Sequence, residues 1–184
     1  MVRHACCSPE DKAAAAAIRL TDKSLYQLDS TWTNDAGAAV TLASLRGRPQ
    51  IVAMFFARCT YACPLLVFQM KQIEASLPES LRDHVGFTLV SFDTERDTPE
   101  VLRTYRKAQA LDGQHWKLLC GSPDAVQDLG ALLNVKFKKD AQGQFQHSNV
   151  ITLLNAAGEL VCQQLGLNSD HDEVVRGVSE LARK

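Results

Sequence analysis

A nearly unbroken apolar run, QIVAMFFA at residues 50–57, constrains the fold of this chain more than any other feature. Pro49 and Arg58 bound the run, so its length suits a strand better than a buried helix. A strand without apolar-polar alternation is buried on both faces, as in a parallel sheet that is covered by helices. The run therefore favours an α/β fold.

Helix and strand patterns alternate after this run and extend the prediction. The expected elements are helix 64–77, strand 85–92, helix 98–109, strand 115–120, helix 122–135, a hairpin at 148–166 and a closing helix at 170–184. Two short strands around the turn NDAG precede the run, within residues 24–49. This order predicts a thioredoxin-like mixed sheet flanked by helices, with an N-terminal β-hairpin and a strand-helix insertion. We place this domain at residues 25–184, after an Ala-rich tail or linker at residues 1–24.

Charge and hydropathy exclude several classes of partner. The formal net charge is −1, and no basic tract or Gly-Lys-Ser/Thr phosphate loop is present, so nothing favours nucleic acid or an anionic membrane. No apolar run reaches the 18 residues of a membrane span. Met1 is followed by polar sequence, so the chain lacks a signal peptide; it is either cytosolic or has lost a leader.

The stretch CTYACP places Cys59 and Cys63 four residues apart, which excludes the Cys-x-x-Cys redox signature. The pair follows the first buried strand and precedes a helix that begins at Pro64. Chemistry in open α/β sheets collects at such carboxyl ends of strands. We expect the helix N-terminus to favour thiolates at both sulfurs. The pair is then a disulfide, a nucleophile with its resolving partner, or two metal ligands; two buried small hydrophobes are the alternative without chemistry.

If the pair binds a metal ion, the site needs a further ligand, and His147 is the candidate. A closed zinc site usually has four ligands, whereas two thiolates and a neutral imidazole favour copper. His147 precedes the penultimate strand, in a loop that lies opposite the first helix in a thioredoxin-like sheet. Thioredoxin-like oxidoreductases carry a cis-proline in that loop, and here the stretch HSN stands instead. A solvated loop histidine is the competing interpretation. The spacing of the remaining cysteines does not indicate a disulfide framework; they are Cys6, Cys7, Cys120 and Cys162.

Three segments together resemble the Sco (SenC-type) copper chaperones, which take part in cytochrome c oxidase assembly. LASLRGRPQIVAMFFARCTYACP is similar to the family's strand that leads into Cys-x-x-x-Cys-Pro, LVSFDTERDTPEVLRTY to its VSxDPERDTPExLxxY, and HSNVITLLNAAGELV to its HSxxxYLxDxxGxxV. The order and spacing agree over about residues 25–183. The chain departs from the pattern at Arg58, beside the first cysteine, and at Thr60-Tyr61-Ala62, where members often carry Pro-Asp-(Val/Ile). We expect Arg58 to add positive charge near the sulfurs.

The resemblance implies that Cys59, Cys63 and His147 bind one copper ion per chain, as Cu(I) or Cu(II). Asp93 and Asp97 match the acidic pair of the central segment, and we expect Asp93 near the copper loop without being a ligand. Thr98 and Pro99 are explained by helix capping.

The resemblance also implies a function and a location. The chain would deliver copper to the binuclear copper site of a respiratory oxidase or related cuproenzyme, as a monomer with a copper or electron donor as a second partner. Alternatively, Cys59 and Cys63 are the catalytic pair of a thiol–disulfide reductase that keeps the partner's cysteines reduced. A peroxiredoxin-like peroxidase would need a Thr/Ser-x-x-Cys start with a supporting Arg, and FFARCTYAC has Phe56 where that Thr or Ser would precede Cys59. Family members work in the bacterial periplasm or mitochondrial intermembrane space; we expect the periplasm, with membrane contact only through an N-terminal anchor missing here. The stretch HACC is either the remnant of a lipoprotein cleavage site or a pair of unmatched cysteines in a flexible tail.

Overall fold

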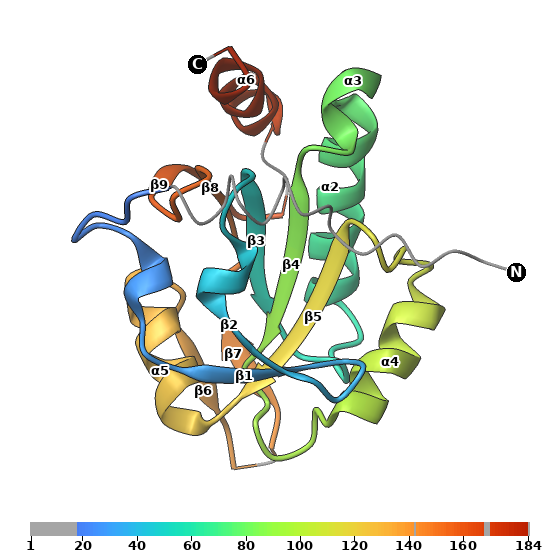
Figure 1. The fold of residues 1–184 in the computed structure, drawn as a ribbon. Coiled ribbons are helices and arrows are strands. Elements are labelled where there is room, and N and C mark those ends of the chain that lie inside the picture. The colour runs from blue at the N-terminus through green and yellow to red at the C-terminus, as the bar shows by residue number, and fades with distance from the viewer. Residues whose placement is uncertain (1–17, 142, 168–169, 184) are drawn as a thin grey trace, which may run out of the picture.

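The computed structural model describes residues 18–141, 143–167 and 170–183. A seven-stranded sheet forms the centre, in the order β2-β1-β5-β4-β3-β8-β9 (Figure 1). Its strands are β1 Thr31–Asn34, β2 Ala39–Thr41, β3 Gln50–Phe55, β4 Gly86–Ser91, β5 Trp116–Gly121, β8 Val150–Leu154 and β9 Leu160–Leu165. Strands β3, β4 and β5 run parallel, and the other pairings are antiparallel. The predicted mixed sheet, N-terminal hairpin included, is confirmed.

Helices pack against this sheet in the predicted order. They are α2 Ala62–Ser76, α3 Glu79–Arg82, α4 Pro99–Ala108, α5 Pro123–Leu132 and α6 Asp172–Leu181, with short 3-10 turns η1 Leu25–Gln27 and η2 Leu42–Leu45. Helix α2 contacts β3 and α6, and α6 also covers β8 and β9. Helix α4 lies along β5 (Figure 1). The loop between β3 and α2 therefore follows a strand whose residues are all buried.

Burial and capping explain why these segments fold as predicted. Every residue of β3 and of β4 is buried, as expected for strands that are covered on both faces. Thr98 Oγ1 accepts the Val101 N–H at 3.4 Å, and Ser122 Oγ accepts the Ala125 N–H at 3.2 Å. The predicted starts of α4 and α5 are thus confirmed as side-chain N-caps.

Two features differ from the sequence-based prediction. Helix α2 begins at Ala62 with Tyr61 as its N-cap, so Pro64 is its third residue instead of its first. The stretch before β8, expected to be a loop, contains a separate antiparallel hairpin of β6 Phe137–Lys139 and β7 Phe145–His147. Each of these strands has three residues, too few to show a clear alternation in the sequence.

The described residues add three observations about the ends of the chain and its cysteines. Leu20 packs against the core although it precedes the predicted domain start at residue 25. No described helix is both long and apolar enough to cross a membrane. Cys6 and Cys7 lie outside the described residues. The structure therefore does not test either interpretation of HACC.

Candidate metal centre

The loop between β3 and α2 brings the two cysteines of CTYACP together. Cys63 is the second residue of α2 and is fully buried, whereas Cys59 lies in the loop and is half-buried. The Cys63 backbone N–H donates to Cys59 Sγ at 3.2 Å, so the first turn of the helix does point an N–H at this sulfur. Both residues are free thiols in the structure.

His147 reaches the pair from the end of the β6–β7 hairpin. Its Nε2 lies 3.7 Å from Cys63 Sγ, and its Nδ1 lies 3.1 Å from the carbonyl oxygen of Ser148. A carbonyl oxygen only accepts, so Nδ1 carries the proton and Nε2 directs its lone pair at the sulfurs. The ligand atoms of Cys59, Cys63 and His147 all lie within 4.8 Å of one another. The structure thus brings all three predicted site residues together.

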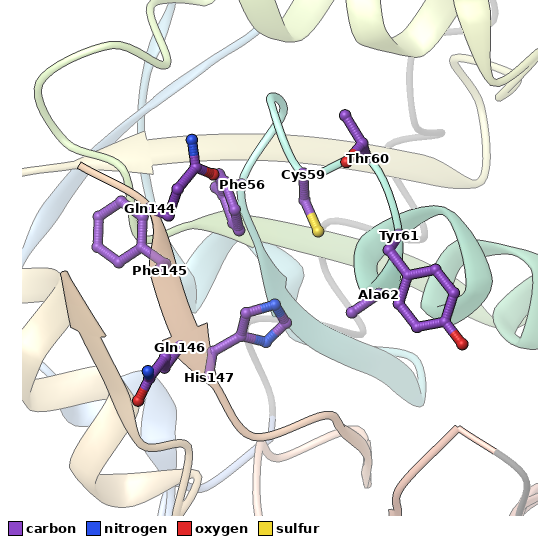
Figure 2. Close-up of a pocket in the computed structure, with 9 residues that line it drawn as sticks. All are labelled: Phe56, Cys59, Thr60, Tyr61, Ala62, Gln144, Phe145, Gln146 and His147. Atoms are coloured by element: carbon purple, nitrogen blue, oxygen red, sulfur yellow. The ribbon is translucent and has the colours of Figure 1, made fainter. Parts of the chain in front are cut away.

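A pocket of about 360 Å³ opens beside Cys59 and His147, and no Asp, Glu, Lys or Arg lines it (Figure 2). Its lining residues are Phe56, Cys59, Thr60, Tyr61, Ala62, Gln144, Phe145, Gln146 and His147. The His147 ring packs edge-on to Phe56, with centroids 5.9 Å apart, and against Phe92 at 5.1 Å. Burial lowers the pKa of His147, which favours the neutral imidazole that a metal needs.

The prediction that both cysteines favour the thiolate is wrong for Cys63. Burial raises the pKa of the Cys63 thiol; the neighbouring Cys59 and Asp97 add to this effect, and a backbone hydrogen bond at Phe56 opposes it. Desolvation therefore outweighs the N-terminus of α2. A bound cation supplies the positive charge that deprotonates such a thiol.

Arg58 does not supply that charge to the pocket. Its exposed side chain lines a different hollow, on the α4 side of the loop, together with Glu100 and Tyr105. No charged side chain appears among the residues that line the pocket of Cys59 and His147. The expectation of an arginine-activated thiolate is therefore not supported by the placement of Arg58.

Asp93 and Asp97, the acidic pair, hold the segments that carry the site without lining its pocket. Asp97 is buried, and its Oδ2 accepts the Ala57 N–H at 2.8 Å and the Ser91 hydroxyl at 2.5 Å, which ties the cysteine loop to β4. Asp93 is also buried; it lies 3.5 Å from Nε of Arg96, whose Nη2 donates to the Gly143 carbonyl at 2.8 Å. Asp93 thereby connects the end of β4 to the turn of the hairpin that carries His147. Neither carboxylate lines the pocket.

The aromatic side chains that pack around the site are functional residues that the sequence analysis did not identify. Phe92 stacks on Phe137 with centroids 5.1 Å apart and meets Phe145 edge-on at 5.1 Å. Phe56 adds a contact to Phe145 at 5.2 Å. The apolar run predicted Phe56 to be buried, but no pattern in a single sequence pairs it with Phe145, about ninety residues away.

The remaining described cysteines stay apart from this pocket. Cys120 Sγ donates to the Thr33 carbonyl at 3.5 Å, and Cys162 lies on β9. Burial raises the thiol pKa of both. Two sulfurs and one imidazole nitrogen within 4.8 Å of one another can therefore hold one soft metal ion, or the two sulfurs can exchange electrons as a thiol–disulfide pair.

Comparison with known proteins defines the class: the SCO1/SenC family matches residues 19–183, so the chain belongs to this family. A SCO1 protein homolog of Bacillus subtilis is 23% identical over 172 residues, covering 90% of this chain and 88% of the relative. Bradyrhizobium japonicum ScoI, solved with copper bound, is 25% identical with a TM-score of 0.67, covering 84% and 96% of the two chains. BsSco, described with a disulfide switch and as a member of the Sco family of cytochrome c oxidase assembly proteins, is 22% identical with a TM-score of 0.71, covering 86% and 94%.

Proposed function

We propose that this chain binds one copper ion through Cys59, Cys63 and His147 and passes it to a cuproprotein by ligand exchange. The observation that carries the proposal is the convergence of the three ligand atoms within 4.8 Å, with the lone pair of His147 Nε2 facing the sulfurs. The copper-bound structure of a relative supports the choice of metal.

The donor set favours Cu(I) over zinc. Zinc in structural sites takes four ligands, and the described residues offer no fourth sulfur, nitrogen or carboxylate ligand at this pocket. Soft thiolates select Cu(I), and imidazole also suits copper. Half-buried Cys59 remains accessible from the pocket mouth, so an incoming ligand can replace one protein ligand at a time.

The recipient in this proposal is the binuclear copper site of a respiratory oxidase or a related cuproenzyme. The description of BsSco as an oxidase assembly protein supports this choice. Tyr61, at the mouth of the pocket, is 75% exposed, and Leu65 and Phe68 continue an exposed apolar row along α2. A recipient that reaches Cys59 through this mouth covers the row. We place the protein in the periplasm and at a membrane; the description of a SCO1/SenC family protein of Bacillus anthracis as a lipoprotein supports the membrane attachment.

A thiol–disulfide reductase is the second candidate function. The closeness of Cys59 and Cys63 favours it, as does the disulfide switch described for BsSco. In that reaction the two thiols become a disulfide as the partner's disulfide is reduced to two thiols. The raised thiol pKa of buried Cys63 lowers its thiolate fraction at neutral pH and so slows thiol–disulfide exchange through this sulfur.

Competition titration of reduced protein with Cu(I) tests the proposal. We expect one Cu(I) per chain in wild type, no tight binding in Cys59→Ala, and affinity at least about 100-fold weaker in His147→Ala, because even indirect partners of a metal ligand contribute 10–100-fold. His84→Ala, an exposed histidine, is the matched control. Full affinity in His147→Ala would exclude the three-residue site. Rapid turnover of disulfide substrates by the metal-free protein would favour the reductase.

A further inference from the structure

A second cluster of ligand-type side chains lies at the other end of α2, outside the copper pocket. Glu74 belongs to the last turn of α2, and Asp112 and His115 lie in the segment that leads into β5. Eleven residues separate Glu74 from Cys63 on the same helix, which corresponds to about 16 Å along its axis. The cluster is therefore independent of the site described above.

Three atoms of this cluster point at one another. His115 Nδ1 lies 3.3 Å from Asp112 Oδ2 and 4.0 Å from Glu74 Oε1. One ligand atom of each residue lies within 4.8 Å of the other two. Ligand atoms about 2.1 Å from a shared metal ion are at most about 4.2 Å apart, so the separations of 3.3 and 4.0 Å from Nδ1 fit such an ion.

The other polar atom of each side chain is held by a separate partner. Trp116 Nε1–H donates to Glu74 Oε2 at 3.1 Å, and the backbone N–H groups of Gln114 and His115 donate to Asp112 Oδ1 at 2.8 and 2.9 Å. Glu74 Oε1 and Asp112 Oδ2 are then the carboxylate oxygens that face His115 Nδ1, and Asp112 Oδ2 lies within hydrogen-bond distance of it.

A carboxylate also stands on the far side of the imidazole. His115 Nε2 is buried and has no well-aligned hydrogen bond among the described residues, and Asp83 Oδ1 lies 3.2 Å from it. A carboxylate beside the far nitrogen of an imidazole is the usual companion of a metal-bound histidine.

The cluster also carries an excess of negative charge. Three carboxylates surround one imidazole; Lys71 donates to the Gln109 carbonyl, and the nearby Arg106 donates to the Asp112 carbonyl but pairs its charge with Asp35. Burial of Glu74, with Asp112 as an additional cause, raises the pKa of the Glu74 carboxyl. A cation between the converging atoms relieves this repulsion.

We propose that Glu74, Asp112 and His115 form a second metal site, which takes a borderline divalent cation such as Zn²⁺. The set holds one nitrogen and two oxygens and no sulfur, so it does not select Cu(I). The imidazole excludes Mg²⁺ and Ca²⁺ as preferred ions, because these take oxygen ligands. Asp83 positions the ring from Nε2 and is not a ligand.

Titration with Zn²⁺ tests the proposal in the full chain. The background protein carries Cys6→Ser, Cys7→Ser, Cys59→Ser, Cys63→Ser and His147→Ala, which remove the tail thiols and the copper pocket. We expect this protein to bind one Zn²⁺, about 100-fold more weakly once His115→Ala is added, because a direct ligand contributes at least as much as its supporting partners. His84→Ala, beside Asp83 and exposed, should leave the affinity unchanged.

Isosteric variants keep the test independent of folding. Glu74→Gln retains an acceptor for Trp116 and Asp112→Asn retains one for the backbone N–H groups, so both should fold while losing Zn²⁺ affinity. Asp83→Asn should weaken binding by about tenfold. Absence of stoichiometric Zn²⁺ binding in the background protein, or equal affinity in His115→Ala, would overturn the proposal and leave a cluster of ion pairs around His115. Neither result bears on Cu(I) binding by the wild-type pocket.

Discussion

At the residue scale, the site depends on the protonation of two side chains. The Ser148 carbonyl fixes the proton of His147 on Nδ1, so its Nε2 is available without any change of tautomer. Cys63, in contrast, is buried and holds its proton in the metal-free protein, because burial raises its thiol pKa. Binding of copper must therefore release the Cys63 proton, since only the thiolate is a ligand.

This difference predicts how copper affinity depends on pH. A proton that is bound in the free protein and absent in the complex makes the apparent affinity rise by about tenfold per pH unit below its pKa. We expect Cu(I) affinity to rise by at least this amount per unit between pH 7 and pH 8.5. The lowered pKa of His147 means that its imidazole is already neutral over this range and contributes no slope. Competition titrations at several pH values measure the effect; a constant affinity would show that Cys63 is not deprotonated on binding.

Residue types and spacing were sufficient to find the three converging residues but not their supports. Cys59, Cys63 and His147 lie in segments that follow one another in the same order as the matching segments of the Sco family. Phe92 and Asp97 act through contacts that only the tertiary structure creates: one packs on the His147 ring, and the other holds the Ala57 N–H. The thiol pKa was mispredicted for the same reason, because burial of Cys63 depends on side chains that are distant in the sequence.

At the element scale, the β6–β7 hairpin positions the histidine. Phe137 lies opposite His147 in the hairpin register and stacks on Phe92, with ring planes 9° apart. Gly143, in the turn, has φ +76 and receives the Arg96 hydrogen bond through its carbonyl. The hairpin is thus fixed to the end of β4 at both its strands and its turn.

Removing the Phe137 ring should therefore weaken copper binding without touching the metal. We expect Phe137→Ala to lower the free energy of unfolding by about 1–3 kcal/mol, less than for a fully buried phenylalanine. Loss of the stack should lower Cu(I) affinity by about 10-fold or more, as for other groups that orient a metal ligand. Lys138→Ala changes the exposed neighbour on the same strand and is the control. Thermal unfolding and Cu(I) competition measure the two effects; unchanged affinity in a destabilised Phe137→Ala protein would show that the hairpin does not position His147.

Helix α2 provides the second element-scale prediction, through its exposed row. Leu65→Ser with Phe68→Ser should leave Cu(I) affinity unchanged, because neither residue lines the pocket. Transfer to a soluble apo domain that carries an oxidase binuclear copper site should slow by about tenfold or more, since an apolar contact surface is lost. Transfer to a small chelator should not slow. Leu132→Ser, an exposed apolar residue on α5, is the control. Equal rates for variant and wild type with the protein acceptor would contradict docking on this row.

Element order was predictable because β3 and β4 are buried on both faces and α4 and α5 begin with Ser/Thr-Pro caps. The start of α2 was misplaced because proline is tolerated throughout the first helical turn, so Pro64 does not fix the first residue. The short hairpin escaped prediction because its stability comes from tertiary aromatic contacts with Phe92.

At the scale of the whole molecule, the copper pocket joins parts that are far apart in the chain. The cysteine loop follows β3 and the histidine ends β7, so a bound ion connects the central sheet to the separate hairpin. Such a link exists in the folded chain alone, because unfolding separates residues 63 and 147. Copper should therefore stabilise the native state by mass action.

Thermal unfolding measures this stabilisation. At free Cu(I) about 1,000 times its dissociation constant, ligand binding to the native state adds about 4 kcal/mol. For a domain of this size we expect the midpoint to rise by about 8–16 °C, because each kcal/mol corresponds to about 2–4 °C. Copper bound by thiols of the unfolded chain would reduce the shift, and His147→Ala, which keeps both thiols, provides the control for that effect. Copper binding should not change the sedimentation of the protein, since the three ligands come from one chain and the ion need not bridge two. Equal shifts for His147→Ala and wild type would mean that copper stabilises the protein without joining the hairpin to the sheet.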